Sequence, residues 1–285
     1  MMDIPLSLTR ILEYGASVHG STTVTTWHGE GTGSEFDPAE EVTFRDIAAR
    51  AAAFAHAIHD DLGITGDERV GSFMWNCAEH LEVMFGTACK GAIFAPLNKQ
   101  LMNDQIRHII NHAEISAIVC DPRLAQQLGK VLVGTDSVKS VIITGAQPAQ
   151  QFAHLFPRGI EVYSYEALID GRSTVYDWPE LDERTAAALC YSTGTTGAPK
   201  GVLYSHRSLY LEAMQLRSSD SLCITHGETF LCCIPICHVL SWGVPFTCFM
   251  TGTPLVLPDA DVSAPTLAKA IAATSPRVAH GVPTI

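Results

Sequence analysis

A chain of 285 residues with 47% hydrophobic and 17% charged side chains can bury a sizeable core, and this composition argues against intrinsic disorder. Its net charge is −12 and it has no basic block, which argues against a nucleic-acid surface and favours a small ligand. The longest apolar stretch, residues 244–257, has 14 residues and is too short to span a membrane.

The cysteines and the N-terminus predict a cytoplasmic protein. Nine cysteines are scattered without the paired spacing of a disulfide framework, so we expect reduced thiols in the core. The first residues carry Asp3 where a signal peptide needs bases, and they lack a continuous apolar region. Peripheral contact with a membrane stays open as an alternative.

The first half of the chain alternates between strands and helices. Thr43 and Asp46 form a variant of the capping box, and apolar residues then recur at helical spacing up to Gly63. Short apolar strands separated by helices of ten to fifteen residues predict an α/β fold, with mostly parallel sheets covered by helices on both faces. The expected strands are 70–75, 92–95, 116–120 and 138–144, and the expected helices are 76–90, with Asn76 as its cap, 103–112, and one that begins after Asp121-Pro122.

Residues 145–184 contain three prolines and a weak pattern, which favours a connection between two parts of the fold. We therefore predict a first α/β lobe over residues 1–184 and the start of a second, incomplete lobe over residues 185–285. In the second lobe the expected strands are 187–191, one at Val202, 230–234, 254–257 and 277–280, and the expected helices are 206–216, 239–250 and 263–273.

A glycine-rich stretch, Tyr191 to Val202, interrupts this second set of elements. Glycines let backbone N–H groups face one concavity, hydroxyls add donors, and a lysine adds positive charge, so the stretch suits a phosphate. It is not a Walker A loop, because Pro199 stands where the second glycine is required and Gly201 where the hydroxyl is required. It also lacks the spacing of a dinucleotide-binding G-x-G-x-x-G motif.

The order Tyr-Ser-Thr-Gly-Thr-Thr-Gly-x-Pro-Lys-Gly-Val resembles the phosphate loop of the adenylate-forming superfamily, which includes acyl-CoA synthetases, luciferases and peptide-synthetase adenylation domains. The resemblance implies the fold of the N-terminal part of that family's large domain. It also implies that the loop holds the β- and γ-phosphates of ATP. The residues that carry this role are Ser192, Thr193, Gly194, Thr195, Thr196, Gly197 and Lys200.

A second segment, Pro235-Ile236-Cys237-His238 followed by Val239 to Gly243, is similar to the family's proline-x-x-histidine segment. The resemblance implies that His238 is catalytic and lies near the substrate carboxylate and the α-phosphate. Trp242 takes the position of a tryptophan that bounds the acyl pocket in medium-chain and methylthioalkanoate CoA ligases. Taken alone, each residue is more typical of a place in the core, and the phosphate loop upstream is what favours a functional role.

Two other groups of residues resemble metal or nucleophile patterns only superficially. His108 and His112 are four residues apart on one predicted helix, but the glutamate of H-E-x-x-H and a third ligand are missing. The cysteines at 232, 233 and 237 do not form a C-x-x-C pair. We expect no metal-ligating residues here, and we expect Tyr191 to end a strand.

Upstream segments also resemble medium-chain acyl-CoA synthetases, among them the stretch from Lys90 to Asn98. Here Ala95-Pro96 precedes Leu97-Asn98 where many relatives carry His-Thr, so the subfamily stays open. The resemblance implies a ligase that activates a fatty or related acid with ATP and Mg²⁺, and then transfers it to CoA. Alternatives are an acyl-AMP ligase that loads a carrier protein and a non-catalytic, truncated nucleotide-binding product.

The family's later segments do not occur in these residues. They are a Tyr-Gly-x-Thr-Glu segment, an aspartate for the ribose, and a C-terminal domain with the lysine that drives adenylation. We therefore expect an N-terminal fragment that does not turn over alone, with an exposed apolar sheet edge that promotes self-association. The acid's chain length and the acceptor are not encoded in recognisable motifs.

Overall fold

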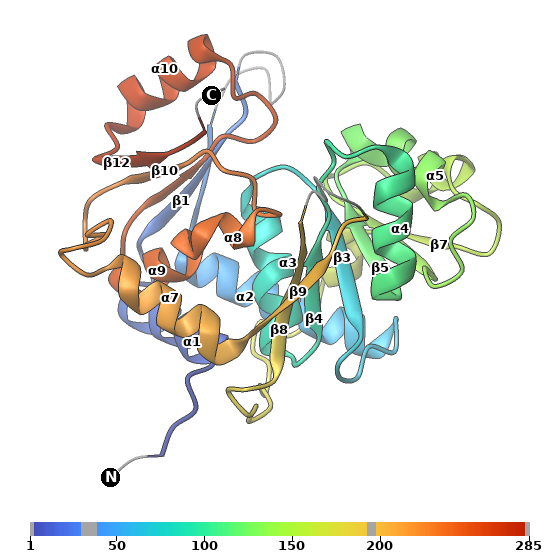
Figure 1. Ribbon diagram of the computed structural model, residues 1–285, viewed down its shortest axis with the longest axis horizontal. Helices are drawn as coiled ribbons and strands as arrows, with labels where there is room; N and C mark the ends of the chain where they lie inside the picture. Colours follow the sequence, from blue (N-terminus) through green and yellow to red (C-terminus); the bar gives the residue numbers. More distant parts are fainter. Residues whose placement is uncertain (1–2, 30–38, 193–197, 283–285) are drawn as a thin grey trace.

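The computed structural model describes residues 3–29, 39–192 and 198–282, in which the strands form two mixed sheets flanked by helices. Figure 1 shows the two sheets side by side, with several helices between them. The α/β class predicted from the alternating pattern is confirmed.

The larger sheet has seven strands in the order β7-β6-β5-β3-β4-β8-β9. All neighbours in it are parallel except the β8–β9 pair. Its central strands are largely buried on both faces, which explains their mostly apolar sequences. The strands are β3 (Arg69–Phe73), β4 (Ile93–Pro96), β5 (Ile115–Cys120), β6 (Ser140–Ile143), β7 (Glu161–Ser164), β8 (Ala186–Tyr191) and β9 (Gly201–Ser205).

The smaller sheet has five strands in the order β12-β10-β11-β1-β2, with only the β1–β2 pair antiparallel. Strand β12 lies at one edge of this sheet. The self-association expected through an exposed apolar edge stays a prediction. The strands are β1 (Thr23–Trp27), β2 (Ala39–Thr43), β10 (Phe230–Cys232), β11 (Leu255–Leu257) and β12 (Val278–His280).

Helices form a layer between the two sheets and cover both outer faces. One continuous core joins the inner faces of both sheets to the middle helices, and includes Phe44 stacked on Phe249 with ring centroids 3.9 Å apart. The middle helices are α1 (Leu8–Val18), α2 (Phe44–Asp60), α3 (Ala78–Cys89), α7 (His206–Leu216) and α9 (Val244–Thr251). The outer helices are α4 (Asn103–Ala113) and α5 (Ala125–Leu132) on the larger sheet, and α10 (Ala264–Thr274) on the smaller one.

The sheets do not divide where the chain was predicted to divide, between residues 184 and 185. Strands β1 and β2 join the sheet of β10 to β12, whereas β8 and β9 extend the sheet of β3 to β7. The predicted connection, residues 145–184, holds the edge strand β7 and the short helix α6 (Tyr165–Ile169). The lobe boundaries 1–184 and 185–285 stay a prediction about domains, and they are not boundaries between sheets.

The start of α2 follows the local sequence, but the start of α3 does not. Thr43 Oγ1 accepts from the Asp46 N–H at 3.2 Å, and Asp46 accepts from the Thr43 N–H at 2.9 Å, as the capping box predicts. The prediction that Asn76 caps α3 is wrong. The N-cap is Cys77, and the Ala78 N–H donates instead to Thr26 Oγ1 at 3.1 Å, from a strand of the other sheet.

The single helix predicted over 239–250 is interrupted. Val239, Leu240, Ser241 and Trp242 all have φ between 42° and 56°, so α8 (Val239–Trp242) is a left-handed turn. Such a turn costs about 1–2 kcal/mol for each L-residue. The polar contacts of Ser241 hold it: Ser241 Oγ donates to the Ile234 carbonyl at 2.7 Å, and the Ser241 carbonyl lies 3.3 Å from His280 Nε2. After Gly243, also at positive φ, the regular helix α9 begins.

Among the described residues, no helix combines the length and the apolar character needed to cross a bilayer. The nine cysteines are free, and all except Cys223 are buried. Burial raises the pKa of several of these thiols, including Cys237, whose pKa is raised to about 11.

Candidate functional site

A cavity of about 500 Å³ lies where the carboxyl ends of strands from both sheets meet. In open parallel sheets, ligands bind beyond these ends, because the loops that follow the strands open into a crevice. The lining follows that rule: Trp75 and Asn76 come after β3, Lys99 and Gln100 after β4, Cys233, Ile234 and Pro235 after β10, Pro258 and Asp259 after β11, and Val282 after β12, with His238, Val239, Trp242 and Val262 completing the wall.

Asn76 joins the two sheets at this cavity. Its Nδ2 donates to the carbonyls of Cys232 (3.1 Å) and Ile234 (2.8 Å). Its Oδ1 accepts from the Ile236 N–H at 3.1 Å. The side chain therefore satisfies three buried backbone groups of the segment that leads to His238, and sequence reasoning missed this function because the partners are about 160 residues away.

His238, predicted as a catalytic residue, lines the cavity. Its backbone N–H donates to the Pro235 carbonyl at 2.9 Å, which closes a turn after β10. The side chain is partly buried, and burial together with the nearby Lys99 ammonium lowers the pKa of His238. The imidazole is therefore neutral at pH 7 and can both donate and accept a hydrogen bond.

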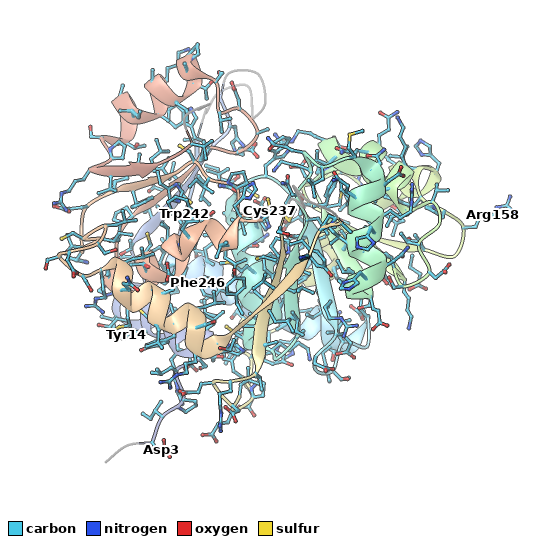
Figure 2. All side chains as sticks on the ribbon, in the orientation of Figure 1. Asp3, Tyr14, Arg158, Cys237, Trp242 and Phe246 are labelled. Carbon is cyan, nitrogen blue, oxygen red and sulfur yellow. The ribbon has the colours of Figure 1, made fainter. Side chains whose placement is uncertain are left out.

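Trp242, predicted to bound an acyl pocket, also lines the cavity and lies on the left-handed turn. Its side chain is 48% exposed, so it is not the buried core tryptophan of the alternative interpretation. Its ring lies 6.0 Å from the ring of His280 in an edge-on arrangement. Figure 2 labels Trp242 near Cys237, in the region where the two sheets approach each other.

Only the ends of the predicted phosphate loop can be placed. The Ser192 N–H donates to the Lys200 carbonyl at 3.0 Å, and the Lys200 N–H donates to Ser192 Oγ at 3.2 Å, so these two residues close a hairpin between β8 and β9. Because β8 is parallel to β4, the loop leaves the larger sheet at the same edge as Lys99. The other predicted phosphate-binding residues, Thr193, Gly194, Thr195, Thr196 and Gly197, lie outside the described residues.

Sequence reasoning also missed Lys99. This side chain is 9% exposed, and its Nζ lies 4.0 Å from the centroid of the Trp75 ring and donates to the Met74 carbonyl at 3.2 Å. Burial lowers the pKa of Lys99. The only available signal was a lysine three residues after a buried apolar strand, which is also common on protein surfaces.

The acids around the cavity, Asp259 and Asp121, pair with Arg123 and His28 and not with Lys99. Asp259 accepts from Arg123 Nη1 (2.8 Å) and Nη2 (2.7 Å), and lies 3.1 Å from His28 Nδ1. Arg123 also binds Asp121. Hydrogen bonds to Asp259 and Glu40 raise the pKa of His28 to about 9. This network ties the ends of β1 and β11 in one sheet to the end of β5 in the other.

Metal ligation has no support in the part of the chain that the structure describes, where no group of three or more His, Cys, Asp or Glu could hold an ion. His108 and His112 stack on α4 with ring centroids 5.6 Å apart, and His112 Nδ1 lies 2.7 Å from the Tyr191 hydroxyl. Tyr191 ends β8, as predicted.

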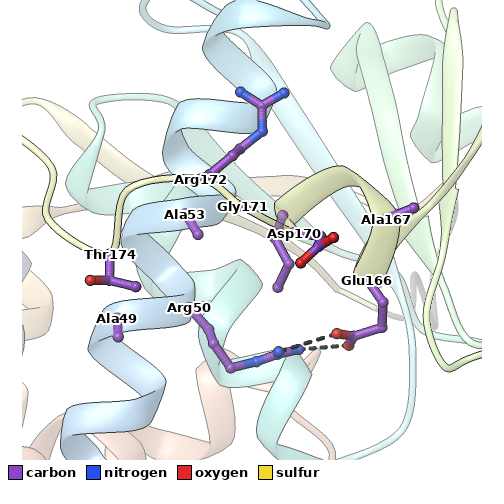
Figure 3. Close-up of a pocket in the computed structure, with 10 residues that line it drawn as sticks. Ala49, Arg50, Ala53, Glu166, Ala167, Asp170, Gly171, Arg172 and Thr174 are labelled. Atoms are coloured by element: carbon purple, nitrogen blue, oxygen red, sulfur yellow. Dashed lines mark hydrogen bonds and ion pairs between the residues drawn. The ribbon is translucent and has the colours of Figure 1, made fainter.

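A second cavity, of about 460 Å³, lies between α2 and α6 (Figure 3). Its basic group is Arg50, whose guanidinium binds Glu166 with two hydrogen bonds of 3.2 and 2.7 Å. Arg50 Nε also donates to the buried Glu82 at 2.8 Å, and the Tyr165 hydroxyl donates to Glu82 at 2.7 Å. Arg172, at the other end, pairs with Asp60 and Asp61.

Comparisons with known proteins match this chain to one family. The family described as AMP-binding enzyme matches residues 13–285. The chain is 32% identical over its whole length to the 3-methylmercaptopropionyl-CoA ligase of Ruegeria lacuscaerulensis, of which it covers 51%. It is also 32% identical to the medium-chain-fatty-acid–CoA ligase of Ectopseudomonas oleovorans, of which it covers 50%.

Solved structures share the fold. A long-chain-fatty-acid-CoA ligase from Archaeoglobus fulgidus matches all of the chain over 54% of its own length, with a TM-score of 0.82 and 22% identity. An anthranilate CoA ligase in complex with anthranoyl-AMP matches 99% of the chain over 51% of its own length, with a TM-score of 0.83 and 22% identity. The chain thus spans about half the length of the curated relatives it matches.

Proposed function

Because this chain belongs to the AMP-binding enzyme family, we propose that it is part of an acid–thiol ligase that activates a fatty or related carboxylic acid. The acid would react with ATP to give an acyl-adenylate and pyrophosphate, and CoA would then take the acyl group. Relatives named as ligases of medium-chain and methylmercapto acids favour an acid of modest length.

The observation that carries this proposal is the composition of the cavity at the strand ends. Apolar side chains, including Trp75, Trp242 and Val262, suit an acyl chain, while His238 and Lys99 supply polar groups in the same space. The hairpin closed by Ser192 and Lys200 leaves the larger sheet at the same edge, which suits a nucleotide beside the acid.

The proposed roles follow from these positions. Ser192, Lys200 and the intervening residues would hold the β- and γ-phosphates, and a neutral His238 would donate a hydrogen bond to an oxygen of the carboxylate or the α-phosphate. Trp242 would bound the acyl chain. Each of these groups acts by positioning and charge stabilisation, which dominate nucleotidyl transfer.

Mg²⁺ would accompany ATP in such a reaction, but the described residues do not form a site for it. Asp259 and Asp121 are the acids close to the cavity, and both are bound by Arg123. Hard divalent cations need free carboxylate oxygens, so we derive no step through a metal ion from these residues.

Two alternatives keep the same site but change its use. An acyl-AMP ligase that loads a carrier protein would share the loop and the cavity and differ in the acceptor. A non-catalytic product would bind nucleotide without adenylation. We propose the same behaviour for these 285 residues when they are tested alone, without the additional length that the relatives have.

Pyrophosphate exchange tests the proposal on the purified chain, with Mg·ATP and acids of four to sixteen carbons, alongside calorimetric titration with ATP. ATP binding without exchange is the expected result. Acid-dependent exchange would show that this chain adenylates alone, and the preferred acid would identify the substrate. His238→Ala should then reduce exchange about 100-fold, whereas His154→Ala, on the exposed surface, should not. If the chain shows no ATP binding and no exchange, that result contradicts the proposal.

A further inference from the structure

Lys99 is a buried cation without a carboxylate partner among the described residues. Its Nζ has three N–H donors, and the one hydrogen-bond acceptor that the described residues offer is the Met74 carbonyl. The Trp75 ring lies beneath the ammonium and shields it from water on one side. A buried ammonium with donors to spare is costly, and such groups normally shift their pKa or bind a counter-charge.

The nearest acids do not neutralise it. Asp259 lines the same cavity, but both of its oxygens are bound by Arg123, and one also faces His28. Asp121 is likewise bound by Arg123. The charges of Asp121 and Asp259 act on Lys99, but neither carboxylate forms an ion pair with its ammonium, which lines the cavity.

A second buried lysine has no carboxylate ion pair among the described residues either, but it lies away from the cavity. Lys90, at the end of α3, is 5% exposed. Its Nζ lies 3.3 Å from His59 Nδ1, and the charges of Glu68 and Asp60 act on it. Lys90 does not line the cavity at the strand ends, so it provides a matched control.

The walls around Lys99 define what could bind it. Trp75, Val239 and Trp242 present apolar surface to the same space, and His238 is close enough for the Lys99 charge to affect its titration. A ligand that fills this cavity would therefore have an apolar body and one anionic end. A carboxylic acid with an alkyl chain has this shape.

We propose that Lys99 binds the carboxylate of the acid and selects for charged acids over neutral ligands of the same shape. The inference rests on the proposed function, since it assumes that the cavity holds the acid. It adds a specificity-determining residue to that site: the ammonium forms a charge-assisted hydrogen bond with the carboxylate beside His238.

The test compares charged and neutral ligands on three proteins. Octanoate and octanamide are titrated calorimetrically into the wild-type chain, Lys99→Met and Lys90→Met, and ATP is titrated into each as a separate arm. Methionine keeps the length and apolar stem of lysine and removes the charge. Near-ultraviolet circular dichroism checks that the variants keep wild-type packing.

The wild-type chain and Lys90→Met should both prefer octanoate to octanamide. Lys99→Met should bind octanoate about 10- to 100-fold more weakly, the usual contribution of one charge-assisted hydrogen bond, with octanamide and ATP unchanged. Loss of the preference for charge cannot come from a general loss of packing, because packing affects both ligands.

Three results would overturn the inference. If Lys99→Met still prefers octanoate, Lys99 does not bind the carboxylate, while the proposed function stands. If only ATP binding weakens in that variant, the ammonium binds phosphate and not the acid. If the wild-type chain binds neither octanoate nor octanamide, the inference fails together with the acid site of the proposed function.

Discussion

Two of the cavities in this molecule contain basic groups in opposite electrostatic situations. In the cavity between α2 and α6, Arg50 pairs with two carboxylates: Glu166, as Figure 3 shows, and the buried Glu82. In the cavity at the strand ends, Lys99 contacts the Trp75 ring and the Met74 carbonyl. The nearby Asp259 forms its ion pair with Arg123. The first cavity also has regular α2 backbone beside it, whereas the second includes a left-handed turn.

This difference separates a structural cluster from a binding site. A buried charge whose partners are all within the protein stabilises one conformation, and removing it leaves another charge unpaired. A buried charge without such a partner, beside strained backbone, contributes little to folding and is retained where a ligand uses it. The predictions below test whether the two cavities differ in this way.

The largest expected effect concerns Arg50. Arg50→Met should lower the free energy of unfolding by about 3 kcal/mol, because the buried Glu82 carboxylate loses its partner. Lys99→Met should not lower it, because that change removes a buried ammonium to which the described residues offer one acceptor. Urea denaturation of both variants measures the two values.

Arg45→Met is the control for this experiment, since Arg45 lies on the same helix as Arg50 and is exposed. Its effect should stay within about 0.5 kcal/mol. Equal losses in Arg50→Met and Lys99→Met would contradict the distinction between the two cavities.

An effect that is smaller per pH unit is expected through His80 on α3. His80 Nδ1 lies 2.9 Å from the Trp75 carbonyl and Nε2 lies 2.8 Å from Ser72 Oγ, and burial lowers its pKa to about 3. The unfolded state then binds more protons between about pH 6.5 and pH 3. Stability should therefore fall as pH drops through this window, by up to about 1.4 kcal/mol per pH unit.

Other groups contribute to the same profile, so the difference between two proteins is the measurement. Burial raises the pKa of Glu82 to about 7, and this shift stabilises the fold as pH falls from 7 towards 4.5, opposing His80. His206, with a pKa lowered to about 4, acts in the same direction as His80. Urea denaturation from pH 7 to pH 4 should give a flatter profile for His80→Asn than for wild type, and parallel profiles would refute the assignment.

The smallest expected effect concerns the strained turn. Val239 is 39% exposed and has a φ of 42°, which a β-branched residue adopts at a cost. Val239→Gly should raise the free energy of unfolding by about 1 kcal/mol, although glycine usually destabilises. Thermal unfolding should show the opposite sign for Val202→Gly, an exposed residue of β9. A loss of stability in Val239→Gly would mean that the turn is not strained.

Much of the secondary structure could be predicted because local signals specify it. The helix predicted over 206–216 forms over those residues, with the Ser205 side chain accepting from the Ser208 N–H at 3.1 Å. The helix after Thr43 begins at its capping box. Prediction failed where a distant contact replaced the local one, as at Asn76. The Asn76 amide donates to the Ile234 carbonyl, and the Ala78 N–H at the start of α3 donates to Thr26 Oγ1 instead.

The candidate site was predicted in part for the same reason. One motif, the proline-x-x-histidine segment with the residues that follow it, pointed to His238 and Trp242, and both side chains line one cavity. Lys99 and Asn76 carried no motif, because their importance depends on burial and on partners from the other sheet. The interruption at Val239 to Trp242 was also not predictable, since an apolar segment is typical of a buried helix.

The sequence by itself determined the alternation of strands and helices, the caps of α2 and α7, and the glycine-rich hairpin, since each depends on side chains within a few residues of one another. The tertiary structure alone decided that β1 pairs with β11, more than 200 residues away, and that the ends of both sheets enclose one cavity. The periodicity of a strand shows which faces are buried but not what covers them. That depends on packing between distant elements, which also leaves Lys99 without a carboxylate partner among the described residues.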